Sequence, residues 1–579
     1  MPDAIHAAPV HDIKARPQRS RIAAEAFLSR LSEHGVDRLF LNPGTDFPSI
    51  VEAFLAAAED DVTVPEPVLV PHENTAVSMA HGYYLVTGRP QAVMVHVSVG
   101  TANTINAIAD ASRDNVPVLL CAGRSPITER GLLGSRNRPI HWAQEMFDQA
   151  SMVREWVKWD YELREPSQID DVVDRAFEVM NTSPPRPVYL TLPREPLAAE
   201  VKAGIALSVR RDPPAAPYPA PADIARLANW IAEAKAPLIV ASGIGRLAED
   251  VERLAAITDR YALPVVCATP RFVCLPTDHP MHAGFDVAPY LADADLIVAI
   301  ECDAPWFPHL ISPRADAKVV HIAEDPAWQR HPIRTFPSAL GITALPGSVL
   351  AALEPVLAER VPQESAIVAT RRARQLDRRA SRLQALAARA VQPHGPITPE
   401  FLSRTIGEAL SDAVIVNEYP LRVEHCTRAK PGTYYGLGTA GGLGWGLGAA
   451  LGIKAADSSK LVVATLGDGS YMFANPAACH WTSDVHTLPI LTIIFNNSRY
   501  GAVRNSTLSM YANGRAGRDN GRFLADLNSN ARWDKLVEAH GGYGERVADA
   551  AELAAAIGRA RHAVEVEGRQ ALLDVICPY

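Results

Sequence analysis

The chain has 579 residues, of which 48% are apolar and 21% are charged, a mixture typical of globular proteins. This length exceeds what one hydrophobic core organises, and we expect several domains. The net charge is −9 without a long basic run, which argues against nucleic acid as a partner. No apolar run is long enough to span a membrane, so we expect no membrane partner. The polar segment 1–20 has no apolar signal core and is predicted to be an N-terminal extension.

The cysteines are dispersed along the chain, and no two of them have CxxC spacing. Several lie in apolar runs. This distribution predicts reduced core cysteines of a cytoplasmic protein, and neither a disulfide framework nor a cysteine metal site.

Three successive blocks alternate short apolar runs with helical stretches, the pattern of a parallel sheet covered by helices. The first block is predicted at 21–195, with a helix over Thr75–Leu85. A proline-rich linker at 212–221 separates it from the second block at 222–356. Strands of these two blocks are predicted at Arg38–Leu41, Ala92–His96, Val116–Ala122, Val188–Leu192, Pro237–Ala241, Pro264–Cys267, Asp295–Ile300 and Lys318–Ile322.

The segment 357–397 is rich in Arg, Ala, Leu and Gln and is predicted to be an exposed linker helix whose basic residues form a solvated face. The third block follows at 398–579. The predicted fold class is therefore α/β, with three consecutive doubly wound parallel-sheet domains. Strands of the third block are predicted at Ala413–Asn417, Lys460–Leu466, Leu488–Phe495 and Ala571–Ile576.

Two polar motifs follow buried strands of the third block. One is Gly467-Asp468-Gly469-Ser470 and the other is Asn496-Asn497-Ser498-Arg499-Tyr500. Open α/β sheets bind ligands at the carboxyl ends of their strands, and glycine lets a phosphate approach backbone N–H groups. Carboxylate, amide and backbone carbonyl oxygens are ligands that Mg²⁺ or Ca²⁺ prefers. We assign Asp468, Asn497 and the carbonyl of Arg499 to such a metal, although each motif alone also fits a turn or a strand-end cap.

The pairing of GDG with NN at this spacing resembles the signature of thiamine-diphosphate-dependent enzymes of the acetolactate synthase and benzoylformate decarboxylase family. The resemblance implies thiamine diphosphate as cofactor, held through Mg²⁺ or Ca²⁺. It also implies pyrimidine-binding, central nucleotide-fold and diphosphate-binding domains in that order. The resemblance also places Leu443 as the support of the bent cofactor. The residues that it assigns to cofactor binding are Asn103, Asn417, Gly441, Gly442, Leu443, Gly467, Asp468, Gly469, Ser470, Asn497, Tyr500, Gly501 and Ala502.

Glu73 lies in Pro71-His72-Glu73-Asn74, directly before a predicted helix. A carboxylate on the aminopyrimidine ring of thiamine helps that ring to take the C2 proton, and this role requires a glutamate shielded from water. Alternatively, Glu73 only complements the helix dipole. In the family, this glutamate and the diphosphate site come from different subunits. The resemblance therefore implies a homodimer or homotetramer with shared active sites.

Within the family, Asn42-Pro43-Gly44-Thr45 resembles a motif of benzoylformate decarboxylase, with Thr45 at the position of an active-site serine. His96 falls where that enzyme has an active-site histidine, and His309 is a candidate for its second-domain histidine. A histidine suits the chemistry because protons must move near neutral pH. We assign catalytic roles to Thr45, His96 and His309 beside Glu73, although His96 could instead be a buried histidine that braces its strand end.

Some positions depart from the family pattern. Pro420 replaces a threonine that contacts the diphosphate, and Val503 stands where pyruvate decarboxylases have a glutamate. Ser506 replaces an aromatic residue that shapes the benzoylformate pocket. The segment 134–145 does not resemble benzoylformate decarboxylase. Its polar residues either face the substrate or form a subunit interface; they are Arg138, His141 and Gln144.

The predicted function is a non-oxidative 2-oxo acid decarboxylase with carboligase capability, acting on a small 2-oxo acid or acyl donor. The alternatives are an acetolactate synthase-type carboligase and a 2-hydroxyacyl-CoA lyase. FAD in the second block is possible, because Val319–Ile322 resembles a strand near the adenine end of such a site, but it is not supported. A catalytically inactive scaffold is disfavoured by the intact motifs. An oxidoreductase is disfavoured because no GxGxxG motif follows a strand with the usual acidic residue.

Overall fold

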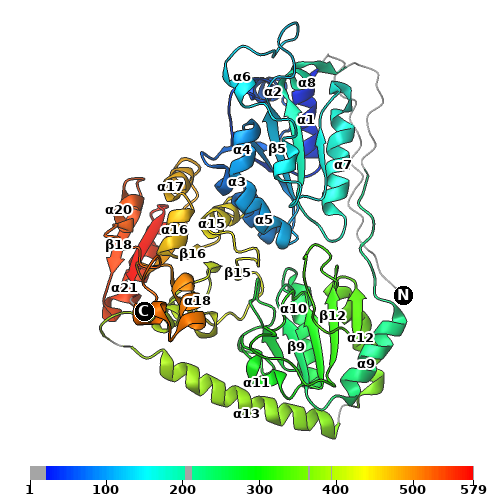
Figure 1. The fold of residues 1–579 in the computed structure, drawn as a ribbon, viewed down its shortest axis with the longest axis vertical. Coiled ribbons are helices and arrows are strands. Elements are labelled where there is room, and N and C mark those ends of the chain that lie inside the picture. Colours follow the sequence, from blue (N-terminus) through cyan, green and yellow to red (C-terminus); the bar gives the residue numbers. More distant parts are fainter. Residues whose placement is uncertain (1–20, 202–210, 363–364, 393, 578–579) are drawn as a thin grey trace.

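The structure is a computed structural model that describes residues 21–201, 211–362, 365–392 and 394–577. The predicted extension at 1–20 lies outside these residues. The described chain forms three α/β domains, and Figure 1 shows the first above the third and the central one. Each domain is built on a parallel sheet, which confirms the predicted fold class. No helix in the described ranges is both long and apolar enough to cross a membrane.

The first domain has a six-stranded sheet in the order β3-β2-β4-β5-β7-β6, and all of its strand pairs are parallel. The two edge strands, β3 and β6, are short and were not predicted. Its strands are β2 (Arg38–Asn42), β3 (Glu66–Leu69), β4 (Gln91–Val95), β5 (Val118–Arg124), β6 (Asp160–Glu162) and β7 (Val188–Pro193), beside an antiparallel pair β1 (Arg21–Ile22) and β8 (Glu200–Val201). Its helices are α1 (Ala23–Glu33), α2 (Pro48–Glu59), α3 (Glu73–Thr87), α4 (Val97–Asn103), α5 (Ile105–Arg113), α6 (Ile140–Ala143), α7 (Ile169–Asn181) and α8 (Arg194–Ala198).

The central domain has a five-stranded parallel sheet in the order β10-β9-β11-β12-β13. The sequence analysis missed the edge strand β13. The strands are β9 (Pro237–Ala241), β10 (Val265–Cys267), β11 (Leu296–Ile300), β12 (Lys318–Ala323) and β13 (Leu340–Thr343). The helices are α9 (Pro221–Glu233), α10 (Ala248–Tyr261), α11 (Ala288–Leu291) and α12 (Pro346–Arg360).

The third domain repeats the six-stranded order as β15-β14-β16-β17-β19-β18. The strands are β14 (Val414–Glu418), β15 (Tyr434–Gly436), β16 (Val462–Gly467), β17 (Leu491–Asn496), β18 (Tyr543–Val547) and β19 (Ala571–Ile576). The helices are α14 (Pro399–Ala409), α15 (Trp445–Ala456), α16 (Asp468–Phe473), α17 (Pro476–Val485), α18 (Gly501–Tyr511), α19 (Arg515–Arg518), α20 (Trp533–Glu538) and α21 (Ala550–Glu565).

Helices α3 and α15 join the first and third domains through glycines. A Cβ on Gly82 would lie 2.1 Å from the carbonyl oxygen of Ala449, and one on Gly452 would lie 2.0 Å from that of Met79. Only glycine permits this close approach of two helix backbones. The contact belongs to one hydrophobic core that continues from the first domain into the third. The start of α3, where Glu73 lies, is therefore fixed against the third domain.

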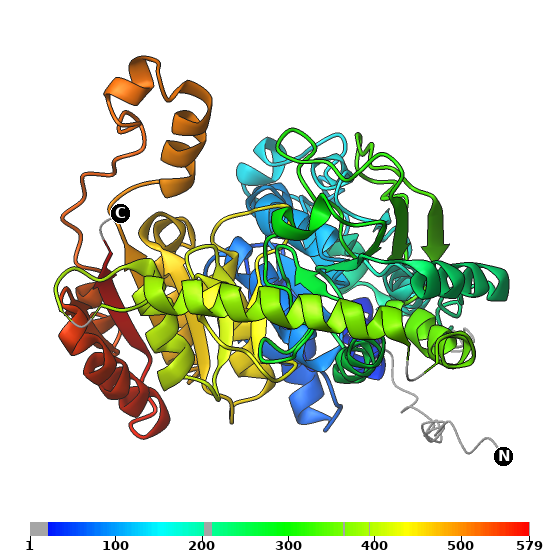
Figure 2. The same ribbon diagram turned by 90° about the horizontal axis from the view of Figure 1, so that it is seen from below.

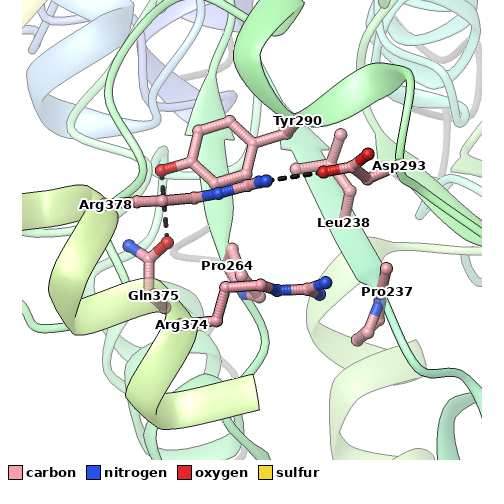
Figure 3. A pocket seen from close by; sticks show the side chains of 9 residues that line it. Pro237, Leu238, Pro264, Tyr290, Asp293, Arg374, Gln375 and Arg378 are labelled. Atoms are coloured by element: carbon pink, nitrogen blue, oxygen red, sulfur yellow. Dashed lines mark hydrogen bonds and ion pairs between the residues drawn. The ribbon is translucent and has the colours of Figure 1, made fainter. Parts of the chain in front are cut away.

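The linker helix α13 (Ala366–Arg389) runs along the underside of the molecule from the central domain to the third domain (Figure 2). Arg371 is only 2% exposed and donates hydrogen bonds to the carbonyls of Ile231 and Ala234 at the end of α9. Arg378 pairs with Asp293 at 2.6 Å and lies beside Tyr290, as Figure 3 shows. The predicted solvated basic face is thus wrong for this side of α13, because its arginines bind the central domain.

All seven cysteines are buried and free, as the sequence predicted.

Candidate active site

The predicted catalytic residues of the first domain, Thr45, Glu73 and His96, lie at the carboxyl edge of its sheet, together with Asp46 and Arg194, which the sequence analysis did not single out. Glu73 follows β3, Asp46 follows β2, His96 follows β4, and Arg194 follows β7. The long segment 125–147 leaves the same edge after β5. Because all strands are parallel, these groups are arranged along one edge in the order of the strands.

Glu73 begins α3, and its Oε2 accepts a hydrogen bond from Nδ2 of Asn103 at 2.5 Å. The structure thus brings Glu73 and Asn103, two residues that the resemblance assigns to the cofactor, into direct contact. A Cβ on Gly100 would lie 3.4 Å from Oε1 of Glu73, so the turn at Gly100 lines the carboxylate. Glu73 is only half-buried in the single chain. The shielded environment expected for it is not produced by these residues alone.

His96 forms a close pair with Asp46, in which Nδ1 lies 2.5 Å from Oδ1. Asp46 is 2% exposed, and its other oxygen accepts a hydrogen bond from the backbone N–H of Val97 at 3.2 Å. Burial alone lowers the pKa of His96, but the hydrogen bond and the charge of Asp46 outweigh burial, and the net pKa is raised. Val97 has φ +28°, a strained conformation for a β-branched residue. The hydrogen bond that Val97 donates to Asp46 holds this strained turn and thereby fixes the imidazole.

Gly44 and Thr45 belong to the turn between β2 and α2. A Cβ on Gly44 would lie 2.2 Å from Nδ1 of His96, so glycine is required for the imidazole to sit there. Thr45 is exposed next to this contact. His309 is exposed in a turn of the central domain, and within the described residues no hydrogen bond or ion pair links it to the other domains.

The segment 134–145, whose role the sequence left open, folds against His96. Oγ of Ser98 donates to the backbone carbonyl of Gln144 at 2.9 Å, and the side chain of Gln144 lies close enough to His96 to contribute to its raised pKa. His141 is buried in the same fold of the chain. The segment therefore forms one wall beside the candidate catalytic histidine.

The GDG and NN motifs meet at the carboxyl edge of the third sheet. Asp468 begins α16, and Asn497 follows the neighbouring strand β17. Burial raises the pKa of Asp468 to about 6, while backbone N–H groups, including that of Asn497, partly offset this effect. The space around Gly467 is open, and a Cβ on Gly469 would lie 2.7 Å from the ring of Tyr500. A buried carboxylate beside an amide and an open glycine turn fits a divalent cation that carries a diphosphate.

The residues after Asn497 form a tight turn. Oδ1 of Asn497 accepts from the backbone N–H of Arg499 at 3.0 Å, and the carbonyl of Arg499 accepts from the N–H of Gly501 at 3.1 Å. A carbonyl has two lone pairs, so that of Arg499 keeps one for a metal. Gly501 and Ala502 begin α18, which continues outward from this turn.

Glu418 organises the glycine-rich turn of the third domain, a role that the sequence analysis missed. It is fully buried and accepts hydrogen bonds from the N–H groups of Gly444 at 2.7 Å and Gly446 at 2.6 Å. Burial raises its pKa to about 7. The N–H groups of both glycines and the nearby Ser470 partly offset this rise, so the carboxylate lies between this turn and the GDG motif. The neighbouring Asn417 is buried, and its amide bonds Tyr434, Leu421 and Thr465.

The turn Gly441–Leu443 is held by helix α5 of the first domain. Asp110 accepts from the N–H of Gly442, and Asn106 donates to the carbonyl of Leu443, both at 2.9 Å. Burial raises the pKa of Asp110 to about 9. Within the described ranges, no hydrogen bond or ion pair joins Glu73 to the residues at 467–470 or 497–502. The chain thus presents two half-sites, one on each sheet edge.

A cavity of about 320 Å³ lies in the central domain, at the carboxyl ends of β9, β11 and β12. Its wall carries four carboxylates, none of which has an ion-pair partner in the described part of the chain: Glu249, Asp250, Glu301 and Glu324. Two arginines also line it, but Arg246 donates to the carbonyl of Asp114 and Arg253 to that of Gly347. This excess of negative charge does not fit the diphosphate of a flavin dinucleotide.

Three family descriptions match the chain in the order of its domains. Residues 21–152 match the N-terminal TPP binding domain of thiamine pyrophosphate enzymes, residues 224–353 match the central domain, and residues 420–575 match the C-terminal TPP binding domain. The two TPP-binding matches contain the half-sites described above, which supports thiamine diphosphate as the cofactor.

Curated relatives are similar over most of their length. A probable 2-ketoarginine decarboxylase of Pseudomonas aeruginosa is 28% identical over 86% of this chain and 85% of its own. Benzoylformate decarboxylase of the same organism is 28% identical over 82% of this chain and 85% of its own. The acetolactate synthase large subunit of Corynebacterium glutamicum is 26% identical over 97% of this chain and 87% of its own.

Solved structures show the same fold. A 4-hydroxybenzoylformate decarboxylase of Rhodococcus jostii superimposes with a TM-score of 0.77 at 22% identity, covering 96% of this chain and 99% of that one. Benzoylformate decarboxylase of Polynucleobacter necessarius gives a TM-score of 0.78 at 20% identity, with the same coverage. With all three domains matched in order, the chain is an enzyme that belongs to the thiamine pyrophosphate enzyme family.

Proposed function

We propose that the protein is a non-oxidative 2-oxo acid decarboxylase with carboligase capability. The observation that carries this proposal is the Asp46–His96 pair at the same sheet edge as Glu73. Decarboxylation must be followed by delivery of a proton to carbon, and a carboxylate-supported imidazole with a raised pKa keeps its proton to higher pH than a free imidazole does. Relatives named as decarboxylases of 2-ketoarginine and benzoylformate support this branch.

When bound, thiamine diphosphate supplies a carbon nucleophile and takes up the electron pair that the departing CO₂ leaves behind. Glu73 would orient the aminopyrimidine ring by a hydrogen bond, and Asn103 positions the Glu73 carboxylate. His96 donates a proton before the aldehyde leaves. Gln144 and the wall that it belongs to limit access of water to His96.

We assign the diphosphate to the edge of the third sheet. Asp468, Asn497 and the carbonyl of Arg499 would hold Mg²⁺ or Ca²⁺, with diphosphate oxygens as further ligands. The open backbone at Gly467 leaves room for a phosphate. Tyr500 would close the site over Gly469. Leu443 would support the cofactor, since the turn that carries it is fixed from two sides by Asp110 and Asn106.

A second copy of the chain would complete each site. Glu73 is half-buried in the single chain, and the half-sites on the first and third domains are not joined by hydrogen bonds in the described ranges. The segment at α18 and α19 stands out from the third domain, as Figure 2 shows, and Phe523 just beyond it is 82% exposed. Exposed apolar side chains on this scale mark an interaction surface. They lie on 500–524 and on the first-domain segment 127–147: Met510, Tyr511, Phe523, Leu524, Leu132, Leu133, Trp142 and Phe147.

The test is the ratio of products formed from a panel of aliphatic and aromatic 2-oxo acids, with and without an acceptor aldehyde. A decarboxylase releases one aldehyde for each CO₂, and an added aldehyde diverts part of the product into a hydroxyketone. An acetolactate synthase-type enzyme instead consumes two 2-oxo acids for each CO₂ and releases no free aldehyde. That stoichiometry would refute the proposed branch of chemistry.

A further inference from the structure

The wall beside His96 carries arginines that lack carboxylate partners. Arg138 lies in the segment 134–145, and Arg194 begins α8 after β7. In the part of the chain that the structure describes, neither arginine has an ion pair with an acid. Both nevertheless lie close enough to His141 for their charges to lower its pKa, after the larger effect of burial.

The acids of this region contact other groups than these two arginines, although the buried Oε2 of Glu195 has no hydrogen-bond partner in the described residues. Glu145 pairs with Arg124 and Arg136, and Glu195 accepts from Thr128. Three further acids bind other partners, namely Asp46 with His96, Glu129 with the indole of Trp142, and Glu73 with Asn103. Of the three arginines whose charges reach His141, Arg136 is paired with Glu145, whereas Arg138 and Arg194 have no carboxylate partner in the described residues.

His141 supplies a second, independent observation. It is only 3% exposed, and its Nδ1 accepts a hydrogen bond from the backbone N–H of Asn137 at 3.1 Å. A neutral imidazole whose Nδ1 accepts must carry its proton on Nε2. Nε2 lies 3.4 Å from Nη1 of Arg194, so two N–H donors face each other. A buried donor without an acceptor is costly, and one anion that lies beside both groups and accepts from each would satisfy both.

The spacing of the strands sets the distance from His141 and Arg194 to the reacting centre at His96. His96 follows β4 and Arg194 follows β7, and β5 lies between these strands. Neighbouring strands are about 4.8 Å apart, so the two strand ends are roughly 10 Å apart. The segment 134–145 bridges this interval, because Gln144 contacts His96 while His141 contacts Arg194. An anion at His141 therefore lies several bonds from a carbonyl carbon at His96.

The anion is not the carboxylate that leaves as CO₂. Cations bound to that group would stabilise the ground state, whose charge is lost in the transition state, and would slow the reaction. A second anionic group, which keeps its charge throughout, gains the same contacts in the ground state and the transition state.

We infer that His141, Arg194 and Arg138 form a specificity subsite for a distal anionic group, so that the preferred substrates are 2-oxo acids with a second acid group at the far end of a medium-length chain. This inference rests on the proposed decarboxylase function and goes beyond it by naming the substrate class. The far group is a carboxylate, or a sulfonate or phosphonate of the same charge. A cationic end, as in 2-ketoarginine, would be repelled.

The experiment compares kcat/KM for CO₂ release from 2-oxoadipate, 2-oxohexanoate and 5-guanidino-2-oxopentanoate with the thiamine-diphosphate-loaded enzyme. The first two substrates have six carbons and differ in the far carboxylate. We expect 2-oxoadipate to exceed 2-oxohexanoate by at least about tenfold, and the guanidino substrate to be the poorest, since charge-assisted hydrogen bonds are the strong ones. A sulfonate or phosphonate analogue that exceeds 2-oxoadipate would identify that form of the far group.

Arg194→Gln and Arg138→Gln should each lower kcat/KM for 2-oxoadipate at least about tenfold more than for 2-oxohexanoate. Arg138 is exposed, so its variant remains informative if Arg194→Gln does not fold. Arg175→Gln on α7 is the matched control, because Arg175 is exposed and pairs only with Glu178 in the described residues. Its kcat/KM values for both substrates should match those of the wild type.

A direct binding measurement keeps the subsite testable apart from turnover. Glutarate should raise the melting temperature of the loaded enzyme more than pentanoate does, and Arg194→Gln should abolish the difference. If no 2-oxo acid loses CO₂ but glutarate binds in this way, the proposed function fails and the subsite stands. If 2-oxohexanoate is decarboxylated as well as 2-oxoadipate, or if glutarate and pentanoate bind alike, the inference is overturned while the proposed function survives.

Discussion

Oδ1 of Asp46 lies 2.5 Å from Nδ1 of His96, and this contact raises the pKa of the imidazole against the effect of burial. A proton donor is active below its pKa, so activity should fall as the pH rises through the raised value. Asp46→Asn keeps a hydrogen-bond acceptor but removes the charge. We therefore expect the alkaline limb of the kcat/KM profile to move to lower pH.

The same profile measured for His96→Ala completes this test. If His96 is the donor, turnover should fall by about 10²- to 10⁴-fold with little change in substrate binding, and the alkaline limb should disappear. If His96 only braces the strand end, the variant would melt at a lower temperature and keep its kinetics. An alkaline limb that stays in place in Asp46→Asn would also contradict the assignment.

Glu418 should be a stability residue of the cofactor-binding turn. Glu418→Ala would leave the buried N–H groups of Gly444 and Gly446 without an acceptor, at a cost of about 1–3 kcal/mol each. We expect a clear drop in melting temperature and weaker thiamine diphosphate binding, measured by scanning and titration calorimetry. Glu424→Ala, at a residue outside these contacts, serves as the control. An unchanged melting temperature for Glu418→Ala would show that the turn does not depend on Glu418.

The raised pKa of Asp110 predicts that the stability of the folded protein depends on pH in a specific way. Its pKa rises from about 3.9 in the unfolded chain to about 9 in the folded protein. Between these values the unfolded chain releases the proton and the folded chain retains it, so stability falls as pH rises, by at most about 1.4 kcal/mol per unit. Asp110→Asn removes this penalty. Its melting temperature should exceed that of the wild type by a margin that widens from about pH 5 to about pH 8.

The control for that series is Asp148→Asn, at an exposed aspartate that pairs with Arg154. It should show no widening margin. A constant difference between Asp110→Asn and the wild type would mean that Asp110 is charged in the folded protein.

Asp468 tests the assignment of the metal. Asp468→Ala removes the charged ligand at the start of α16 while leaving the buried sheet intact, so the protein should fold and fail to retain thiamine diphosphate and Mg²⁺. Titration calorimetry with the cofactor and metal measures this directly. Undiminished cofactor binding would rule out Asp468 as a ligand.

The sequence predicted the central strands of each sheet because their apolar runs are continuous, as in Val462–Gly467. It missed the edge strands β3, β13 and β18, in which apolar residues alternate with exposed ones or are few. Glu73 and Asp468 could be proposed from the sequence because each stands in a local motif. Asp46 could not, since its partner His96 lies fifty positions away on another strand. The arginines of α13 were misjudged because composition does not reveal which carbonyls a helix will meet.

The central claim is that Glu73 activates the cofactor at the edge of the first sheet. The direct measurement is the rate of hydrogen–deuterium exchange at C2 of bound thiamine diphosphate, followed by quenched-flow NMR in the wild type and in Glu73→Gln. Glutamine keeps a hydrogen bond but lacks the charge, so the cofactor should still bind while exchange slows by orders of magnitude, each factor of ten being about 1.4 kcal/mol of barrier. Exchange at the wild-type rate in Glu73→Gln, with the cofactor bound, would contradict the account.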